Sequence, residues 1–146
     1  MLAPSDRPVG IQIVAGILFV VAAAEAIGTF FFGVGLLGHL DPSYVPGWIP
    51  PELLDLFRRA PMWYIAAGTF VLWPVKVGLL IAAGLAMLAQ KRRGRLLVNL
   101  YVAASLIESG VTAAAMGADV RTLVGALFPF LVFLGVNKIF AEDLKY

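Results

Sequence analysis

The chain has 146 residues, of which 61% are hydrophobic and only 14% are charged, and its net charge is +2 at neutral pH. A water-soluble domain carries about 25% charged residues, so this composition excludes an ordinary soluble domain and indicates an integral membrane protein. The chain has no cysteine, which excludes disulfides, thiolate metal sites and iron–sulfur clusters, and its single histidine excludes a haem held by two histidines of one chain. We therefore expect no cofactor and no metal, and the one short basic run does not indicate nucleic-acid binding.

The first predicted transmembrane helix covers residues 9–32. The apolar stretch that contains it continues to Leu40, and Glu25 is its only acidic residue. About twenty helical residues span the hydrocarbon core of a bilayer, which is about 30 Å thick. The glycines between residues 33 and 38 favour an end of the helix near residue 32. Ala24 and Gly28 form a pair of small residues at which another helix can approach closely.

Residues 39–62 form a long connection that we expect to lie outside the membrane. Its prolines before residue 52 exclude a regular element there, whereas residues 51–59 predict a short helix with acidic residues at its start and arginines at its end. Trp48, Leu53 and Phe57 give this segment an apolar face that suits a helix lying at the membrane interface. Two interpretations stay open, a structural cap over the bundle and a lid over a cavity.

Three further transmembrane helices are predicted at residues 63–90, 96–116 and 122–140. Pro74 and Pro129 fall inside two of them, and each removes one hydrogen bond from its helix. Short connections make consecutive helices antiparallel neighbours. The predicted fold is therefore a single all-α transmembrane domain over the whole chain, an up-down-up-down bundle of four helices with a short interfacial helix in its first external loop.

The lysines and arginines of the tails and loops are unevenly divided between the two sides of this bundle. Seven lie on the side of the termini and three on the opposite side. By the positive-inside rule, both termini are cytoplasmic and the 39–62 loop is external, in a multi-pass protein of the plasma (inner) membrane. The seven are Arg7, Lys91, Arg92, Arg93, Arg95, Lys138 and Lys145, and the three are Arg58, Arg59 and Arg121.

Glu25, Lys76 and Glu108 are the charged residues that fall deep inside the predicted helices. Counted at about 1.5 Å per residue from the cytoplasmic ends, their depths are similar, roughly 17–21 Å. A single charge near the bilayer centre costs about 2.5–3.5 kcal/mol on insertion scales, and pairing Lys76 with a glutamate removes much of this cost. We therefore expect the three side chains to point into the bundle and to meet there.

Several hydroxyl-bearing residues lie at helical spacing from the three charged residues. Together with the charged residues, they form a predicted intramembrane polar cluster. The hydroxyl-bearing members are Thr29, Thr69, Ser105, Ser109 and Thr112. The serines near Glu108 have no histidine that could activate them, and no catalytic motif is present, so no catalytic residue is predicted.

Two interpretations of the charges stay open. Two carboxylates and one ammonium leave one negative charge, so the second carboxylate either holds a proton or needs another cation. In the functional interpretation, this carboxylate exchanges a proton or accepts a cation. In the structural interpretation, the three charges fix the register of the helices, and the extra proton is permanently bound.

Residues Ala24-Glu25-Ala26-Ile27-Gly28-Thr29 resemble the first-helix motif of small multidrug resistance transporters, and Leu72-Trp73-Pro74 resembles the start of their second helix. The resemblance implies that Glu25 is a site of exchange between protons and cationic drugs. The chain departs from that family in the length of the loop between the two motifs, in Lys76, which has no counterpart there, and in its third helix, which lacks the family's glycines.

Three functional hypotheses follow. The leading one is a non-enzymatic accessory or scaffold subunit that binds other membrane subunits in the lipid bilayer. The first alternative is a proton- or cation-coupled transporter of small molecules that acts as a homo-oligomer. The second alternative is a lipid-binding protein or membrane enzyme with an intramembrane pocket beneath the segment that contains Trp48 and Phe57.

Overall fold

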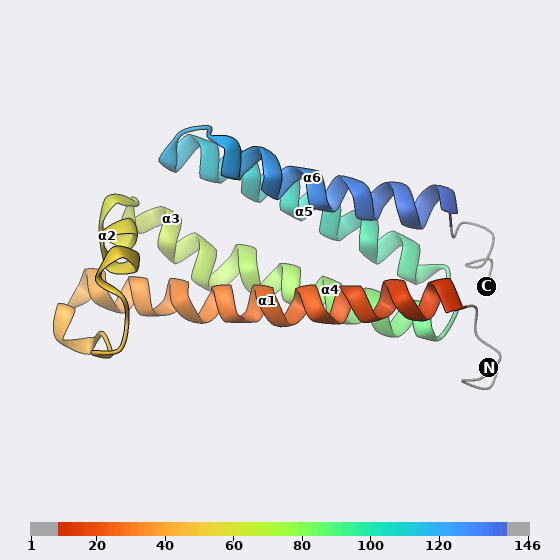
Figure 1. Ribbon diagram of the computed structural model, residues 1–146, viewed down its shortest axis with the longest axis horizontal. Coiled ribbons are helices and arrows are strands. Elements are labelled where there is room, and N and C mark those ends of the chain that lie inside the picture. The colour runs from red at the N-terminus through yellow and green to blue at the C-terminus, as the bar shows by residue number, and fades with distance from the viewer. Residues whose placement is uncertain (1–8, 140–146) are drawn as a thin grey trace.

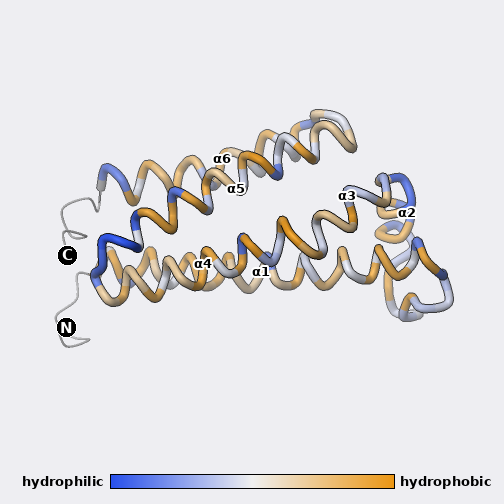
Figure 2. Tube along the Cα trace, turned by 180° about the vertical axis from the view of Figure 1, so that it is seen from behind, coloured by the Kyte–Doolittle hydropathy of each residue, from blue (hydrophilic) through white to orange (hydrophobic). Residues whose placement is uncertain are grey.

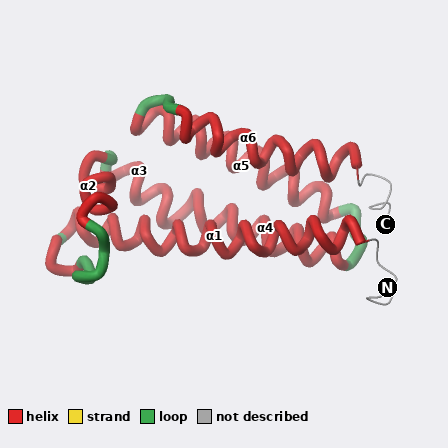
Figure 3. Tube along the Cα trace, viewed as in Figure 1, coloured by secondary structure: helices red, strands yellow, loops and turns green. Residues whose placement is uncertain are grey.

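A computed structural model describes residues 9–139 of the chain. Every regular element in this range is a helix, so the prediction of an all-helical chain is confirmed (Figure 3). Three helices are long and apolar enough to cross a membrane, and they cover Val9–Leu40, Met62–Leu88 and Arg93–Met116. The last helical segment contains a shorter apolar stretch, Thr122–Lys138.

Helix α1 covers Val9–Leu40 and continues well beyond the predicted end at residue 32. The glycines near its end do not end the helix. They make room for side chains from the following segment. A Cβ atom on Gly35 would lie 2.7 Å from the ring of Phe57, and one on Gly38 would lie 3.0 Å from Val45. These glycines therefore let the connection fold closely against the end of α1.

The connection after α1 contains a short 3₁₀ turn, Pro42–Tyr44, followed by α2, Pro51–Arg59, at the predicted position of the short helix. The side chain of Asp41 caps the turn by accepting a hydrogen bond from the backbone N–H of Ser43, which lowers the pKa of this exposed carboxyl group. His39 is tied to α2, because its ring Nε2 lies 2.8 Å from the carbonyl oxygen of Phe57.

The second long helical segment is interrupted by a wider turn. It consists of α3, Met62–Ala67, a π-helical turn, Gly68–Leu72, and α4, Trp73–Leu88. Pro74 has no N–H to continue the ordinary hydrogen-bond ladder, and a π turn is one way in which a helix accommodates such a break. The predicted boundaries of 63–90 are corrected to 62–88.

The last two helices form a hairpin. Helix α5 covers Arg93–Met116, and α6 covers Val120–Leu134 and runs on through a π-helical end, Gly135–Ile139. Both begin earlier than predicted, and Phe140, the predicted last helical residue, lies outside the described range. The α6 start is fixed by a capping box, in which Asp119 accepts from the backbone N–H of Thr122.

The four long helical segments lie beside one another in chain order. Helix α1 packs against α4, α4 against α5, and α5 against α6, whereas α1 and α6 make at most isolated contacts within residues 9–139. Figure 1 shows that the α5–α6 hairpin diverges from α1 and α3 toward the end that carries α2. Both ends of the described chain lie at the opposite end of the molecule (Figure 1).

Two apolar clusters hold these helical segments together. The first, near the ends of the described chain, includes Ile11, Leu18, Leu80 and Tyr101. The second lies beneath α2 and consists of Phe57, Ala60, Tyr64 and Ile65, with partly buried neighbours from α1 and α5. The two clusters lie at different levels along the helices. Polar side chains can therefore lie at the level between them.

The close approach predicted at Gly28 involves an aromatic ring. A Cβ atom on Gly28 would overlap the ring of Trp73 from α4, so this glycine lets the Trp73 ring lie directly on the α1 backbone. Ala24, the other member of the predicted pair, is exposed. The contact between α1 and α4 therefore depends on the small size of residue 28.

Replacing Gly28 with alanine is expected to lower the free energy of unfolding by about 1–3 kcal/mol, the usual cost of adding a methyl group to a filled contact. Gly16, also on α1, has open space around its Cβ position, so Gly16→Ala is the matched control and should be neutral or slightly stabilising. Thermal unfolding of both variants in detergent checks this, and equal midpoints for the two would contradict the contact.

Candidate functional site

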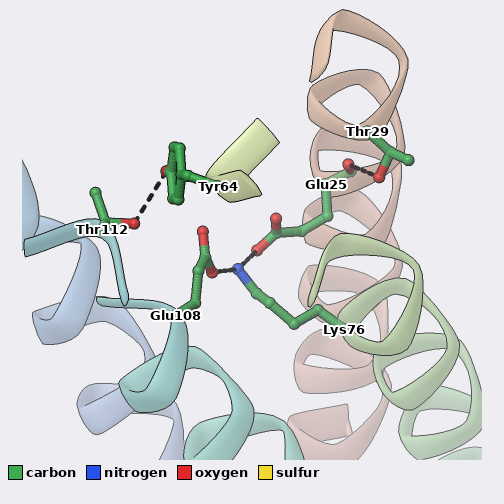
Figure 4. A network of polar contacts seen from close by, with 6 residues as sticks. All are labelled: Glu25, Thr29, Tyr64, Lys76, Glu108 and Thr112. Carbon is green, nitrogen blue, oxygen red and sulfur yellow. Dashed lines mark hydrogen bonds and ion pairs between the residues drawn. The ribbon is translucent and has the colours of Figure 1, made fainter. Parts of the chain in front are cut away.

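Three charged side chains from three helices meet at the centre of the molecule (Figure 4). The Lys76 ammonium from α4 lies 2.7 Å from Oε1 of Glu25 on α1, and it also donates a hydrogen bond to Oε2 of Glu108 on α5. We call these three residues the ionic cluster. Their side chains are only 6%, 12% and 15% exposed for Lys76, Glu25 and Glu108.

The position of the ionic cluster follows from the order of residues along each helix. On α1, Glu25 follows the buried Ala22 of the first apolar cluster, and on α4, Lys76 precedes the buried Leu80 of the same cluster. The Lys76 ammonium also lies 5.0 Å from the ring centroid of Trp73, a cation–π contact one turn away on its own helix. The charges are thus held between apolar layers, where an unpaired charge would be costly.

A cleft of about 660 Å³ extends from the ionic cluster toward the α5–α6 turn. Its volume lies within the range of about 300–1,000 Å³ that is typical of small-molecule sites. Its walls are mainly aliphatic and aromatic, with contributions from all the long helices and from α2. The lining residues are Val21, Glu25, Phe32, Leu56, Phe57, Ala60, Tyr64, Trp73, Lys76, Tyr101, Glu108, Ser109, Thr112, Met116, Gly117, Asp119, Thr122, Val124, Gly125, Phe128 and Pro129.

A hydrogen bond joins two residues of the cleft wall on the side of α2. The hydroxyl of Tyr64 on α3 lies 3.0 Å from Oγ1 of Thr112 on α5, and both residues line the cleft (Figure 4). This bond joins α3 and α5. The cleft therefore has the ionic cluster at its inner end and the Tyr64–Thr112 hydrogen bond in its wall.

The structure separates the predicted hydroxyl residues into two groups. Ser109 and Thr112 line the cleft with the ionic cluster. Thr29 and Thr69 donate to backbone carbonyls four residues earlier on their own helices, at 2.9 Å and 2.8 Å, and they do not line the cleft. Ser105 is buried outside the lining. Helical spacing alone could not distinguish a hydroxyl group that faces a cavity from one that satisfies its own backbone.

The three residues of the predicted lid also lie in different surroundings. Phe57 is buried and lines the cleft, so this part of α2 covers it. Leu53 packs against the apolar cluster beneath α2, and Trp48 stacks on Phe30 with 6.4 Å between ring centroids, so neither lines the cleft. In the lid interpretation Trp48 would lie over the cavity, but Trp48 instead packs on the exposed ring of Phe30 on α1.

Sequence reasoning missed several lining residues. Tyr101 precedes Glu108 by seven residues, which is two helical turns, so its place on the same face of α5 is a signal that the sequence carries. Tyr64 is brought to the cleft by α3, and Phe128 and Pro129 by α6, and no charge or spacing in the sequence indicated these positions.

No family model matches this chain, and no match was found among curated proteins or solved structures. These comparisons therefore add no support to the resemblance of residues 24–29 and 72–74 to small multidrug resistance transporters. The site must be interpreted from its own geometry.

Replacing Lys76 with methionine is expected to lower the free energy of unfolding by about 3–5 kcal/mol, because it leaves two buried carboxylates without their cation. Lys91→Met is the matched control, since Lys91 is exposed in the loop before α5 and should show no measurable effect. Reversible unfolding in mixed micelles measures both variants.

A triple variant, Glu25→Gln, Lys76→Met and Glu108→Gln, should recover most of this loss, because it removes the charges together. If Lys76→Met were as stable as Lys91→Met, the ionic cluster would not be a buried, paired group.

Proposed function

We propose that the chain is an integral membrane protein that inserts as an up-down-up-down bundle of four passes, with both termini cytoplasmic and the connection that carries α2 outside. Three apolar helices of sufficient length support this proposal. On α6, Leu123, Leu127 and Leu131 are 72%, 55% and 56% exposed, which suits contact with acyl chains. Hydrophilic residues gather at α2 and at the loop between α4 and α5, at opposite ends of the long helices (Figure 2).

The absence of cysteine from the chain makes this topology simple to test. In intact cells, a membrane-impermeant maleimide should label Ser43→Cys, in the external connection, and should label Lys91→Cys only after the membrane is opened. Both positions are exposed. Labelling of both variants in intact cells, or the reverse pattern, would contradict the proposed orientation.

We infer that this membrane protein binds an amphiphile, a lipid or another molecule with an apolar body and a polar head, inside the cleft. The single observation that carries this proposal is a cleft of about 660 Å³ with apolar walls and the ionic cluster at one end. An apolar body fits beside Phe32, Phe57 and Phe128, while a polar head can reach Glu25 and Glu108. Ligand sites of this kind combine apolar walls with a few convergent polar groups.

This proposal is the second alternative of the sequence analysis, and the cleft is the reason to prefer it. An accessory or scaffold subunit needs surfaces for its partners but has no need of a cavity that reaches a buried ionic cluster. A proton- or cation-coupled transporter also needs such a cavity, and it would need in addition a second conformation in which the cleft opens to the cytoplasmic side.

Binding can be followed with Trp73, which lines the cleft, in a variant that carries Trp48→Phe and Trp63→Phe. In lipid nanodiscs, a dodecanol brominated on its chain should quench Trp73 fluorescence in a saturable manner. A matched variant that retains Trp63 instead of Trp73 is the reference, because Trp63 is exposed and lies outside the cleft lining. Quenching that rises with probe concentration equally in both variants would contradict binding in the cleft.

Filling the cleft should abolish the saturable quenching. Gly125 on α6 lines the cleft and has open space at its Cβ position, so Gly125→Phe places a ring in the cavity without a backbone clash. Gly110 on α5 has equally open space but lies outside the lining, so Gly110→Phe is the matched control and should bind normally. Equal binding by the two variants would place the ligand elsewhere.

A further inference from the structure

Resting on the proposed binding function, we infer that the cleft selects amphiphiles whose head group donates hydrogen bonds and carries no negative charge. Amines and alcohols with a long apolar chain belong to this class. Lipids and fatty acids with an anionic head do not.

The first observation concerns the oxygen atoms of the ionic cluster. Glu25 uses Oε1 and Glu108 uses Oε2 to accept from Lys76. Each carboxylate has a second oxygen, and within residues 9–139 no further hydrogen bond or ion pair of either carboxylate is found. In the interpretation in which the second carboxylate accepts a cation, both carboxylates are ionised and only accept hydrogen bonds, so these two oxygens call for donors, and both residues line the cleft.

The second observation concerns the positive charge that an anionic head would need. Among the lining residues whose side chains the structure describes, Lys76 is the only cationic one, and its ammonium already contacts both carboxylates. Its remaining surroundings include the face of Trp73, at 5.0 Å from the ring centroid. An anion would have to displace a glutamate from Lys76, which would leave a buried carboxylate unpaired.

The third observation concerns the other end of the cleft. The start of α6 would favour an anion, because backbone N–H groups point outward there. In this protein Asp119 occupies the position, and its carboxylate accepts from the N–H of Thr122 at 3.0 Å. Asp119 also lines the cleft, so an anionic head would find this helix start already occupied by a carboxylate. The backbone N–H group of Thr122 is therefore not free to receive an anionic head.

Chains of equal length with different heads test this inference in the Trp73-only protein described above. The probes are chain-brominated dodecanol, dodecylamine and dodecanesulfonate, the last of which stays anionic at every pH used. The alcohol and the amine should show saturable quenching, and the sulfonate should bind at least about tenfold more weakly, which corresponds to about 1.4 kcal/mol.

A change in head-group preference separates recognition from a merely structural role of the glutamates. Glu108→Gln removes one negative charge from the cleft, so the difference between amine and sulfonate should shrink, and Glu25→Gln provides a second variant if the first does not fold. Glu52→Gln on α2 is the matched control, because Glu52 is exposed and lies outside the lining.

The outcomes are distinguishable. Saturable binding of all three heads with similar affinity would overturn the head-group inference and leave the binding function standing. Head-group preference that is the same in Glu108→Gln, Glu25→Gln and the control would also overturn it. The absence of saturable binding for every head would overturn the binding function itself.

Discussion

The structure depends on one lysine held between two carboxylates that belong to different helices. The backbones of α1 and α4, and of α4 and α5, pack closely, whereas α1 and α5 are joined through side chains, by the first apolar cluster and by the contacts of Lys76 to Glu25 and Glu108. In an apolar environment none of these three charges is stable without the others. The ionic cluster therefore fixes how the α1–α4 pair and the α5–α6 hairpin meet.

The cleft is a consequence of this arrangement. On one side of the ionic cluster, the apolar cluster that contains Leu80 and Tyr101 closes the space between the helices. On the other side, α2 and Phe57 fill the space next to α1 and α3, while the α5–α6 hairpin diverges (Figure 1). The result is a cavity with apolar walls and acceptor oxygens at its inner end, and this combination supports a binding function rather than a purely structural one.

Much of the site is encoded in patterns that a sequence displays directly. Charged residues are rare in apolar helices and must find partners, so the similar depths of Glu25, Lys76 and Glu108 are enough to predict that their side chains meet. The end of α1 was harder to predict, because glycines usually favour a break, whereas in the structure Gly35 and Gly38 stay helical and make room for Phe57 and Val45. The cleft could not be predicted, since it arises from the divergence of the hairpin, a property of packing between segments far apart in the sequence.

The most direct test of this account is a distance measurement by solid-state NMR in lipid bilayers, between ¹⁵N at lysine Nζ and ¹³C at glutamate Cδ. The account predicts strong dipolar recoupling for Lys76 that falls in part with Glu25→Gln and in part with Glu108→Gln, since each variant removes one of its two partners. A Lys76 signal without recoupling, or one that is insensitive to either substitution, would contradict it, and neither the ionic cluster nor the proposed cleft chemistry would stand.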